Sequence, residues 1–131
     1  MSDSGCMPAA FGGMLLHDYA ITGIDVDPGR QKMRLQLCDP AGVDAGRLEF
    51  NHVCRAQVEG WALQNIILEL SVFTDVRTSF EYRRVCSMLG LDPAVPGIFA
   101  SGGCMVLLEA SAGAEIALLL SQPWSAAPLA S

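Results

Sequence analysis

The chain has 131 residues, of which 51% are hydrophobic and 17% charged, and its formal net charge is −6. This length suits one globular domain with a single hydrophobic core. Only 8 Lys and Arg stand against 14 Asp and Glu. This balance excludes the dense positive charge that binds nucleic acids and anionic membranes, so we expect neither partner. The apolar runs are far shorter than the ~20 residues of a membrane-spanning helix. Together with an N-terminus that lacks the features of a secretory signal, they predict a cytoplasmic protein.

The two ends of the chain differ in composition from its middle. Residues 1–13 mix Ser, Gly, Pro and Ala without periodicity, and residues 122–131 form a tail punctuated by proline. We therefore expect two flexible ends around a single folded domain at residues 14–121. Five cysteines without CxxC spacing predict buried free thiols in a reducing compartment.

Two stretches in the first third of the chain have the pattern of paired strands. Over residues 19–27 the apolar positions change parity at Gly23, which indicates a strand with a bulge. The stretch "KMRLQLC" (32–38) alternates between apolar and polar residues, as a half-buried strand does. Since the strong turn "DPGRQ" (27–31) joins them, we expect an antiparallel hairpin.

Three more strands are predicted between residues 47 and 73. They lie in "RLEFNHV" (47–53), in residues 54–59 and in "IILELSVF" (66–73), and "GWALQN" (60–65) is a turn between the last two. The third is apolar on both parities near its start, which is typical of a central strand covered on two faces. We interpret Glu69 inside it as an edge or solvent-facing residue.

One good helix is predicted, in "TSFEYRRVCSMLG" (78–90). Thr78 and Glu81 have capping-box spacing, and Gly90 stands where a left-handed C-cap is expected. Apolar side chains recur at helical spacing, and this face should lie on the sheet; they are Tyr82, Val85, Met88 and Leu89.

The last two apolar runs, "CMVLLEAS" (104–111) and "AEIALLLS" (114–121), flank "AGA" like a closing hairpin. The whole pattern predicts an α+β fold, a mostly antiparallel meandering sheet of about seven strands with one main helix packed on it. Both parities of the hairpin are apolar. Either the sheet curls over itself or a second copy covers it, and we favour a homodimer through Cys104–Leu120.

The sequence contains no complete catalytic motif, so we predict no catalytic residue, no metal ligand and no cofactor. The chain has only two histidines, and an alternative hypothesis is a small metal-dependent hydrolase that uses His17, Asp18 and His52. Cys54 beside His52 lacks a third, orienting group for nucleophilic catalysis. A further alternative is an oligomeric accessory domain.

Four short motifs in residues 16–70 agree in order and spacing with one known family. They are "LHD" (16–18), the strand with Ile21 and Ile24, "LEFNHV" (48–53) and "EGWALQNII" (59–67). With these motifs the segment resembles immunity protein family fifty, small bacterial proteins assigned to polymorphic toxin systems. Leu16 stands where such proteins commonly have phenylalanine, and the helix and final hairpin have no counterpart.

The resemblance implies a noncatalytic protein that binds and neutralises a cognate toxin. Its signature residues would be His17, Asp18, Trp61, Gln64 and Asn65. An acidic surface suits this role, because negative charge steers association with a basic toxin. We further expect His17 and Asp18 to hydrogen-bond the turn at Gln64 and Asn65 and so to fix the register of the sheet.

Overall fold

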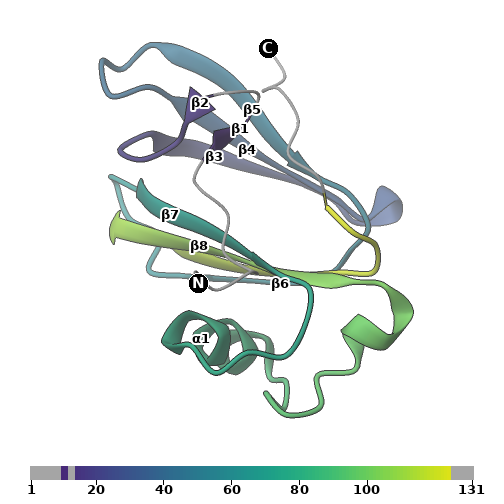
Figure 1. Cartoon of the computed structure of the whole chain (residues 1–131). Coiled ribbons are helices and arrows are strands. Elements are labelled where there is room, and N and C mark those ends of the chain that lie inside the picture. Colours follow the sequence, from purple (N-terminus) through teal and green to yellow (C-terminus); the bar gives the residue numbers. More distant parts are fainter. Residues whose placement is uncertain (1–9, 12–13, 125–131) are drawn as a thin grey trace.

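The computed structural model describes residues 10–11 and 14–124, and it contains one seven-stranded antiparallel sheet and one α-helix (Figure 1). This confirms the predicted α+β fold. Within the described residues, no helix is both long and apolar enough to cross a membrane. The strands of the sheet are β3 (Ala20–Asp27), β4 (Lys32–Cys38), β5 (Asp44–Phe50), β6 (Val53–Glu59), β7 (Ile66–Phe73), β8 (Cys104–Ala112) and β9 (Glu115–Leu120), and the helix is α1 (Phe80–Leu89).

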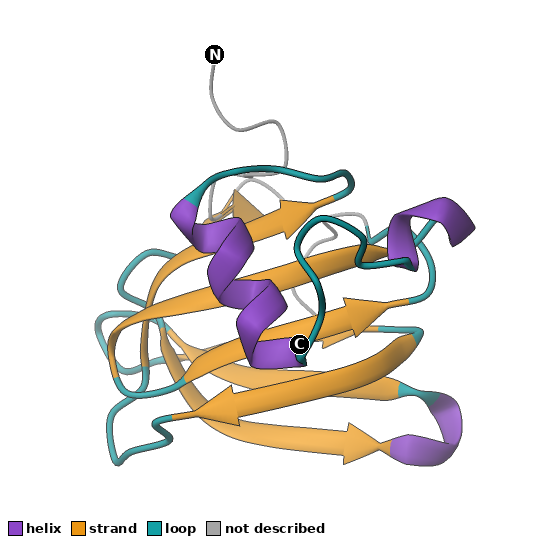
Figure 2. Ribbon diagram, turned by 90° about the horizontal axis from the view of Figure 1, so that it is seen from below, coloured by secondary structure: helices purple, strands orange, loops and turns teal. Residues whose placement is uncertain are grey.

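The sheet is folded into two layers. Its strand order is β5-β4-β3-β7-β8-β9-β6, and β3 and β7 share a single Cα pair, Ala20 with Ile66. The two strands diverge beyond this pair, so that β3–β5 lie over β6–β9 in Figure 1. Helix α1 lies across the outer face of the β6–β9 layer (Figure 2).

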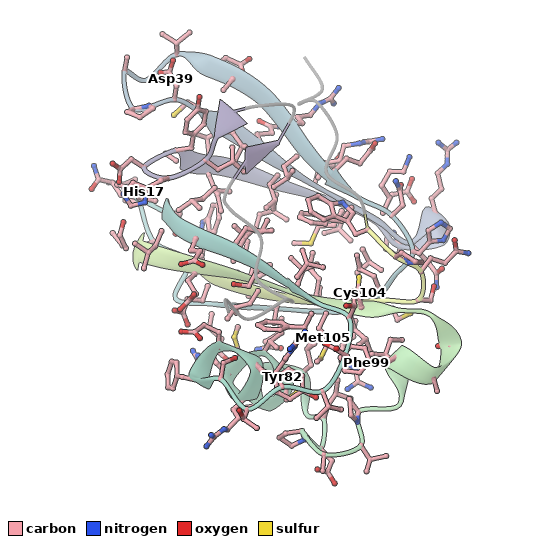
Figure 3. All side chains as sticks on the ribbon, viewed as in Figure 1. His17, Asp39, Tyr82, Phe99, Cys104 and Met105 are labelled. Carbon is pink, nitrogen blue, oxygen red and sulfur yellow. The ribbon has the colours of Figure 1, made fainter. Side chains whose placement is uncertain are left out.

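Each residue parity of the final hairpin faces a different core, because side chains alternate along a strand. In β8, Val106 belongs to the core between the two layers, whereas Met105 belongs to the core under α1. Tyr82 from the helix is fully buried in this second core, where its ring meets Phe73 edge to face with centroids 5.6 Å apart (Figure 3).

The chain itself therefore covers both faces of the hairpin. Its apolar residues from Cys104 to Leu108 and from Ile116 to Leu120 are at most 8% exposed. The sheet curls over itself, the first of the two alternatives drawn from the sequence. The homodimer was predicted because an apolar face was expected to be uncovered, and this face is buried within the chain. The homodimer through Cys104–Leu120 stays a prediction that light scattering can test.

The first hairpin has the predicted bulge and turn. The β3–β4 register shifts between Ile21 and Gly23, which leaves Thr22 as the extra residue. The turn is a short 3₁₀ helix, η1 (Pro28–Arg30), and the Asp27 side chain accepts a hydrogen bond from the Arg30 amide. A second 3₁₀ helix, η2 (Ile98–Ser101), precedes β8.

The N-cap of helix α1 lies one residue later than predicted. Ser79, not Thr78, is the N-cap: its backbone is extended and its Oγ accepts from the Tyr82 amide over 3.2 Å. The predicted capping box was therefore wrong, since Glu81 is the second helical residue and its carboxylate lies in the first turn. The predicted C-cap, Gly90, is confirmed.

The Ser79 cap can be tested directly. Ser79→Ala should lower the free energy of unfolding by about 1 kcal/mol, because the Tyr82 amide then loses its acceptor. Thr78→Ala is the control, and we expect a change below about 0.5 kcal/mol. Urea denaturation followed by circular dichroism measures both. A larger loss for Thr78→Ala would instead place the cap at Thr78.

Parts of the two predicted flexible ends lie within the described residues. Ala10–Phe11 (β1) pairs with Met14–Leu15 (β2) in a short ladder. At the other end, Trp124 packs on Phe50 with ring centroids 5.0 Å apart, and its Nε1–H donates to the Glu49 carbonyl over 3.2 Å. The remaining end residues, 1–9, 12–13 and 125–131, are outside the described part of the chain.

The prediction of buried thiols holds for only some of the cysteines. Cys86 and Cys104 are buried and Cys38 is half-buried, whereas Cys54 is exposed on the edge strand β6, an edge that no local pattern indicates. All four are free. Cys6 lies outside the described residues.

Candidate functional site

The turn between β6 and β7, residues 60–65, is held by the side chain of Asn65. This residue is 2% exposed, and its Oδ1 accepts from the amides of Ala62 and Ala114, both over 2.9 Å. Its Nδ2 donates to the Ala62 carbonyl over 2.7 Å. Three hydrogen bonds from one buried amide thus tie this turn, here called the Asn65 loop, to itself and to the β8–β9 turn.

The β8–β9 turn approaches the Asn65 loop so closely that only glycine fits at its tip. Gly113 has φ +85°, and a Cβ placed there would lie 2.2 Å from the Gln64 carbonyl oxygen and 2.4 Å from Asn65 Oδ1. Such a contact is far inside van der Waals distance. The two turns therefore support each other, and the Asn65 loop has little freedom to move.

Two large apolar side chains project from this fixed loop. Trp61 is 48% exposed and Leu63 is fully exposed. Exposed single apolar residues are common on protein surfaces. An exposed tryptophan on a loop that is already ordered is, however, the type of residue that often dominates the affinity of an interface.

A pocket of about 350 Å³ lies between the Asn65 loop and the start of β3. It forms at the place where β3 leaves β7, after their single Cα pair. None of its lining residues is charged; they are Ala20, Ile21, Thr22, Trp61, Ala62, Leu63, Gln64, Asn65 and Ile66. We call this pocket with the exposed Trp61 and Leu63 the loop surface.

His17 and Asp18 lie beside β7 but do not bond to the side chains of Gln64 or Asn65. The His17 Nδ1 lies 3.0 Å from the Leu68 carbonyl oxygen and its Nε2 lies 3.4 Å from Asp18 Oδ1. Both side chains are more than half exposed, and Figure 3 shows His17 at one end of the two layers. The predicted hydrogen bond from these side chains to the turn at Gln64 and Asn65 was wrong.

The chain around His17 nevertheless pairs with the end of the Asn65 loop through its backbone. The Asp18 amide donates to the Ile67 carbonyl over 2.9 Å, and the Ile21 amide donates to the Asn65 carbonyl over 2.7 Å. The two halves of the predicted signature are therefore neighbours. The backbone joins them, while the Asn65 side chain turns to Ala62 and Ala114.

The structure does not bring His17, Asp18 and His52 together. His17 lies before β3, beside Leu68. The residue after His52, Val53, bonds through its amide to the Gln31 carbonyl beyond the far end of β3. The eight residues of β3 span about 25 Å at ~3.3 Å per residue. Among the described residues, no three His, Cys, Asp or Glu side chains gather where a metal ion could sit.

A row of glutamates crosses the β6–β9 layer near the Asn65 loop, on the face that carries α1. Glu59 pairs with Glu115 across β6 and β9, and Glu69 pairs with Glu109 across β7 and β8. Arg84 from the helix bonds to Glu115 over 2.8 Å and to Glu59 over 3.1 Å. We call the four glutamates the glutamate row; they are Glu59, Glu115, Glu109 and Glu69.

The surroundings of Glu109 disfavour its charge. Burial first, and then the charges of Glu81, Glu69 and Glu115, raise the pKa of Glu109 above its usual value of 4.5. Like charges opposite each other on adjacent strands destabilise a sheet. The charge of Glu109 therefore lowers the stability of the fold at neutral pH.

Glu109→Gln should raise the free energy of unfolding at pH 7 by roughly 0.5–1 kcal/mol. Because the folded pKa lies above the unfolded one, the stability that Glu109 contributes is present below pH 4.5 and is lost as pH rises through the folded pKa. The gain should therefore shrink toward pH 4.5. Urea denaturation at several pH values measures it. Glu115→Gln is the matched control and should show no gain, because it removes the negative charge that pairs with Arg84.

Sequence reasoning selected part of this site and missed the rest. It selected Trp61, Gln64 and Asn65 through the resemblance, and it left out Leu63 and Gly113. "AGA" was only a hairpin turn in the sequence, and no sequence signal shows that it meets the Asn65 loop. Glu109 has no periodic signal of its own, because its burial and the charges of Glu81 and Glu69, both distant in sequence, create its environment.

The fold and the loop surface together define an α+β domain with an exposed apolar loop at one end of a two-layered antiparallel sheet. In comparisons with protein-family models, curated proteins and solved structures, no match to this chain was found.

Proposed function

We propose that the chain is a noncatalytic protein-binding domain that uses the loop surface, and that its role is that of an immunity protein against a bacterial toxin. The single observation that carries the binding proposal is the fixed Asn65 loop with half-exposed Trp61 and fully exposed Leu63. The immunity role comes from the resemblance of residues 16–70 to immunity protein family fifty.

A fixed loop favours binding because little ordering is left for the moment of association. Immobilising side chains and loops on binding costs roughly 0.5–1.5 kcal/mol for each flexible side chain. The bonds of Asn65 and the close approach of Gly113 have already ordered this loop. Trp61 is also the residue type most enriched among interface residues that dominate affinity.

The charge of the protein supports a basic partner. The net charge is −6, and the glutamate row adjoins the Asn65 loop through Glu59, the residue before Gly60. Negative potential at the rim of an apolar surface accelerates association with a positively charged protein. Many toxins that act on nucleic acids need such positive charge for their substrates.

The test is co-expression with the products of the neighbouring genes. Each open reading frame that flanks the gene for this chain is expressed alone and together with the chain. We expect one product to stop growth alone and the chain to restore it. If no neighbouring product is toxic, or if the chain rescues none, the immunity role is wrong.

A variant pair then tests the loop surface in the same assay. Leu63→Asp should abolish rescue, because it places a charge at the centre of the proposed interface. Val95→Asp is the control, since Val95 is likewise an exposed apolar residue, at 74%, but lies after helix α1 and away from the loop. Equal rescue by both variants would show that the toxin binds another surface. Circular dichroism checks that both variants fold.

A further inference from the structure

We infer that the free edge of strand β6 joins the same edge of a second copy of the chain, so that residues 55–59 of the two copies pair antiparallel about a twofold axis at Gln57. This interface differs from the Cys104–Leu120 hairpin, whose apolar side chains are buried within the chain. It also does not depend on the proposed function. Three observations carry it: an open strand edge, a self-complementary sequence and unbalanced charges beside the strand.

Strand β6 has a free edge. It stands at one end of the strand order, and among the described strands it pairs with β9 alone. At its start the Val53 amide is already bonded to the Gln31 carbonyl over 2.9 Å. Residues 55–59 follow and pair with β9 in unbroken register, and residues 54–57 are exposed. The backbone groups on the free side of such a strand can bind a further strand.

The opposite edge of the sheet, β5, is partly covered. Trp124 packs on Phe50 of this strand, and its indole N–H donates to the Glu49 carbonyl. Natural proteins also protect strand edges with proline, lysine or a bulge. The register of β6 shifts before residue 55, but residues 55–59 have no such shift and contain neither proline nor lysine. The edge of β6 is therefore the more open of the two.

The open segment is complementary to itself in the antiparallel direction. Gln57 is its central residue, so full overlap of two copies places Gln57 opposite itself. The same register sets Arg55 opposite Glu59 on one face of the sheet. On the other face it sets Ala56 opposite Val58. Opposite charges and apolar pairs that face each other directly stabilise antiparallel strands, and twofold symmetry repeats each pair.

The charges on the helix side of β6 are unbalanced within one copy. Arg84 bonds to both Glu59 and Glu115, so that one cation serves two carboxylates, and the Glu59 side chain is still 42% exposed. Arg55 donates to the Leu89 carbonyl at the end of α1 and forms no ion pair with a described residue. Antiparallel pairing brings the surplus positive charge of each copy to the surplus negative charge of the other.

Two opposite substitutions of Gln57 test the axis on the full chain. Analytical ultracentrifugation of the unaltered chain should show a dimer, with twice the mass of 13.9 kDa. Gln57→Lys and Gln57→Glu each place like charges opposite each other, so each variant alone should raise the Kd of the dimer at least ~10-fold. An equimolar mixture of the two should recover the dimer, because lysine then faces glutamate.

Gln36→Lys is the matched control. Gln36 is also an exposed strand glutamine, and the substitution adds the same charge, but β4 is paired on both sides, with β3 and β5. The Kd of the dimer should therefore stay unchanged. Circular dichroism checks that all variants fold.

Three results would overturn the inference. The unaltered chain could stay a monomer at concentrations up to ~1 mM, which is the range of very weak association. Gln57→Lys could leave the dimer intact, which would assign the contact to another surface such as the Cys104–Leu120 hairpin. A mixture of the two variants that stays monomeric would place Gln57 away from the axis.

Discussion

Replacing Asn65 with alanine is expected to lower the free energy of unfolding by about 2–3 kcal/mol. The variant removes three hydrogen bonds, and the Ala114 amide, in a residue only 2% exposed, is left without its acceptor. A buried donor without a partner costs about 1–3 kcal/mol. The groups of Ala62 lie at an exposed residue and can turn to water, so they add less. Urea denaturation followed by circular dichroism measures the change.

Two further variants define what the Asn65 result means. Gln64→Ala changes an exposed neighbour in the same loop and should stay within about 0.5 kcal/mol of the unaltered chain. His17→Ala should have a similarly small effect, because His17 is exposed and its ring makes one bond to the Leu68 carbonyl. In a double-mutant cycle His17 and Asn65 should be additive. Strong coupling would mean that the His17 and Asn65 side chains interact, contrary to the structure.

Replacing Gly113 with alanine is expected to destabilise the fold by more than about 3 kcal/mol. A left-handed backbone costs a residue other than glycine about 1–2 kcal/mol. The new Cβ would also overlap the Gln64 carbonyl oxygen and Asn65 Oδ1, at 2.2 and 2.4 Å. Relief requires the two turns to separate, which would break the bond between Asn65 and Ala114.

Gly42→Ala is the matched control for this variant. Gly42 has φ +86°, almost the same as Gly113, but a Cβ there meets no atom within 4 Å. Gly42→Ala should therefore lower the free energy of unfolding only by the conformational cost of about 1–2 kcal/mol. The difference between the two variants isolates the contact between the turns. Equal losses would mean that the turns are not closely packed.

Local pattern was enough to predict most of the fold. The alternation in "KMRLQLC", the turn at "DPGRQ" and the helical spacing from Tyr82 to Leu89 each depend on residues that are near in sequence. The N-cap was misplaced because Thr78 and Ser79 are both hydroxyl residues, and spacing to Glu81 favoured the wrong one. The sequence left open whether the sheet curls into two layers, since this follows from β3 and β7 diverging after a single pair.

The site was harder to predict because its parts are distant in sequence. Asn65 was correctly selected as a turn residue, but its partner Ala114 is 49 residues away. The side chains of His17 and Asp18 were expected to hydrogen-bond the turn at Gln64 and Asn65, but only the backbone around them pairs with this segment. The pocket forms where two strands separate, and neither strand shows this in its own sequence.

Binding of a protein partner at the loop surface can be followed by nuclear magnetic resonance of the full chain mixed with the neighbouring gene product that it neutralises. The chain has two tryptophans, so its spectrum has two indole N–H signals. Trp61 lines the pocket, whereas Trp124 packs on Phe50 and donates to Glu49. We expect the Trp61 signal to shift on binding and the Trp124 signal to stay. Binding that moves only the Trp124 signal, or neither signal, would mean that the partner binds outside the loop surface.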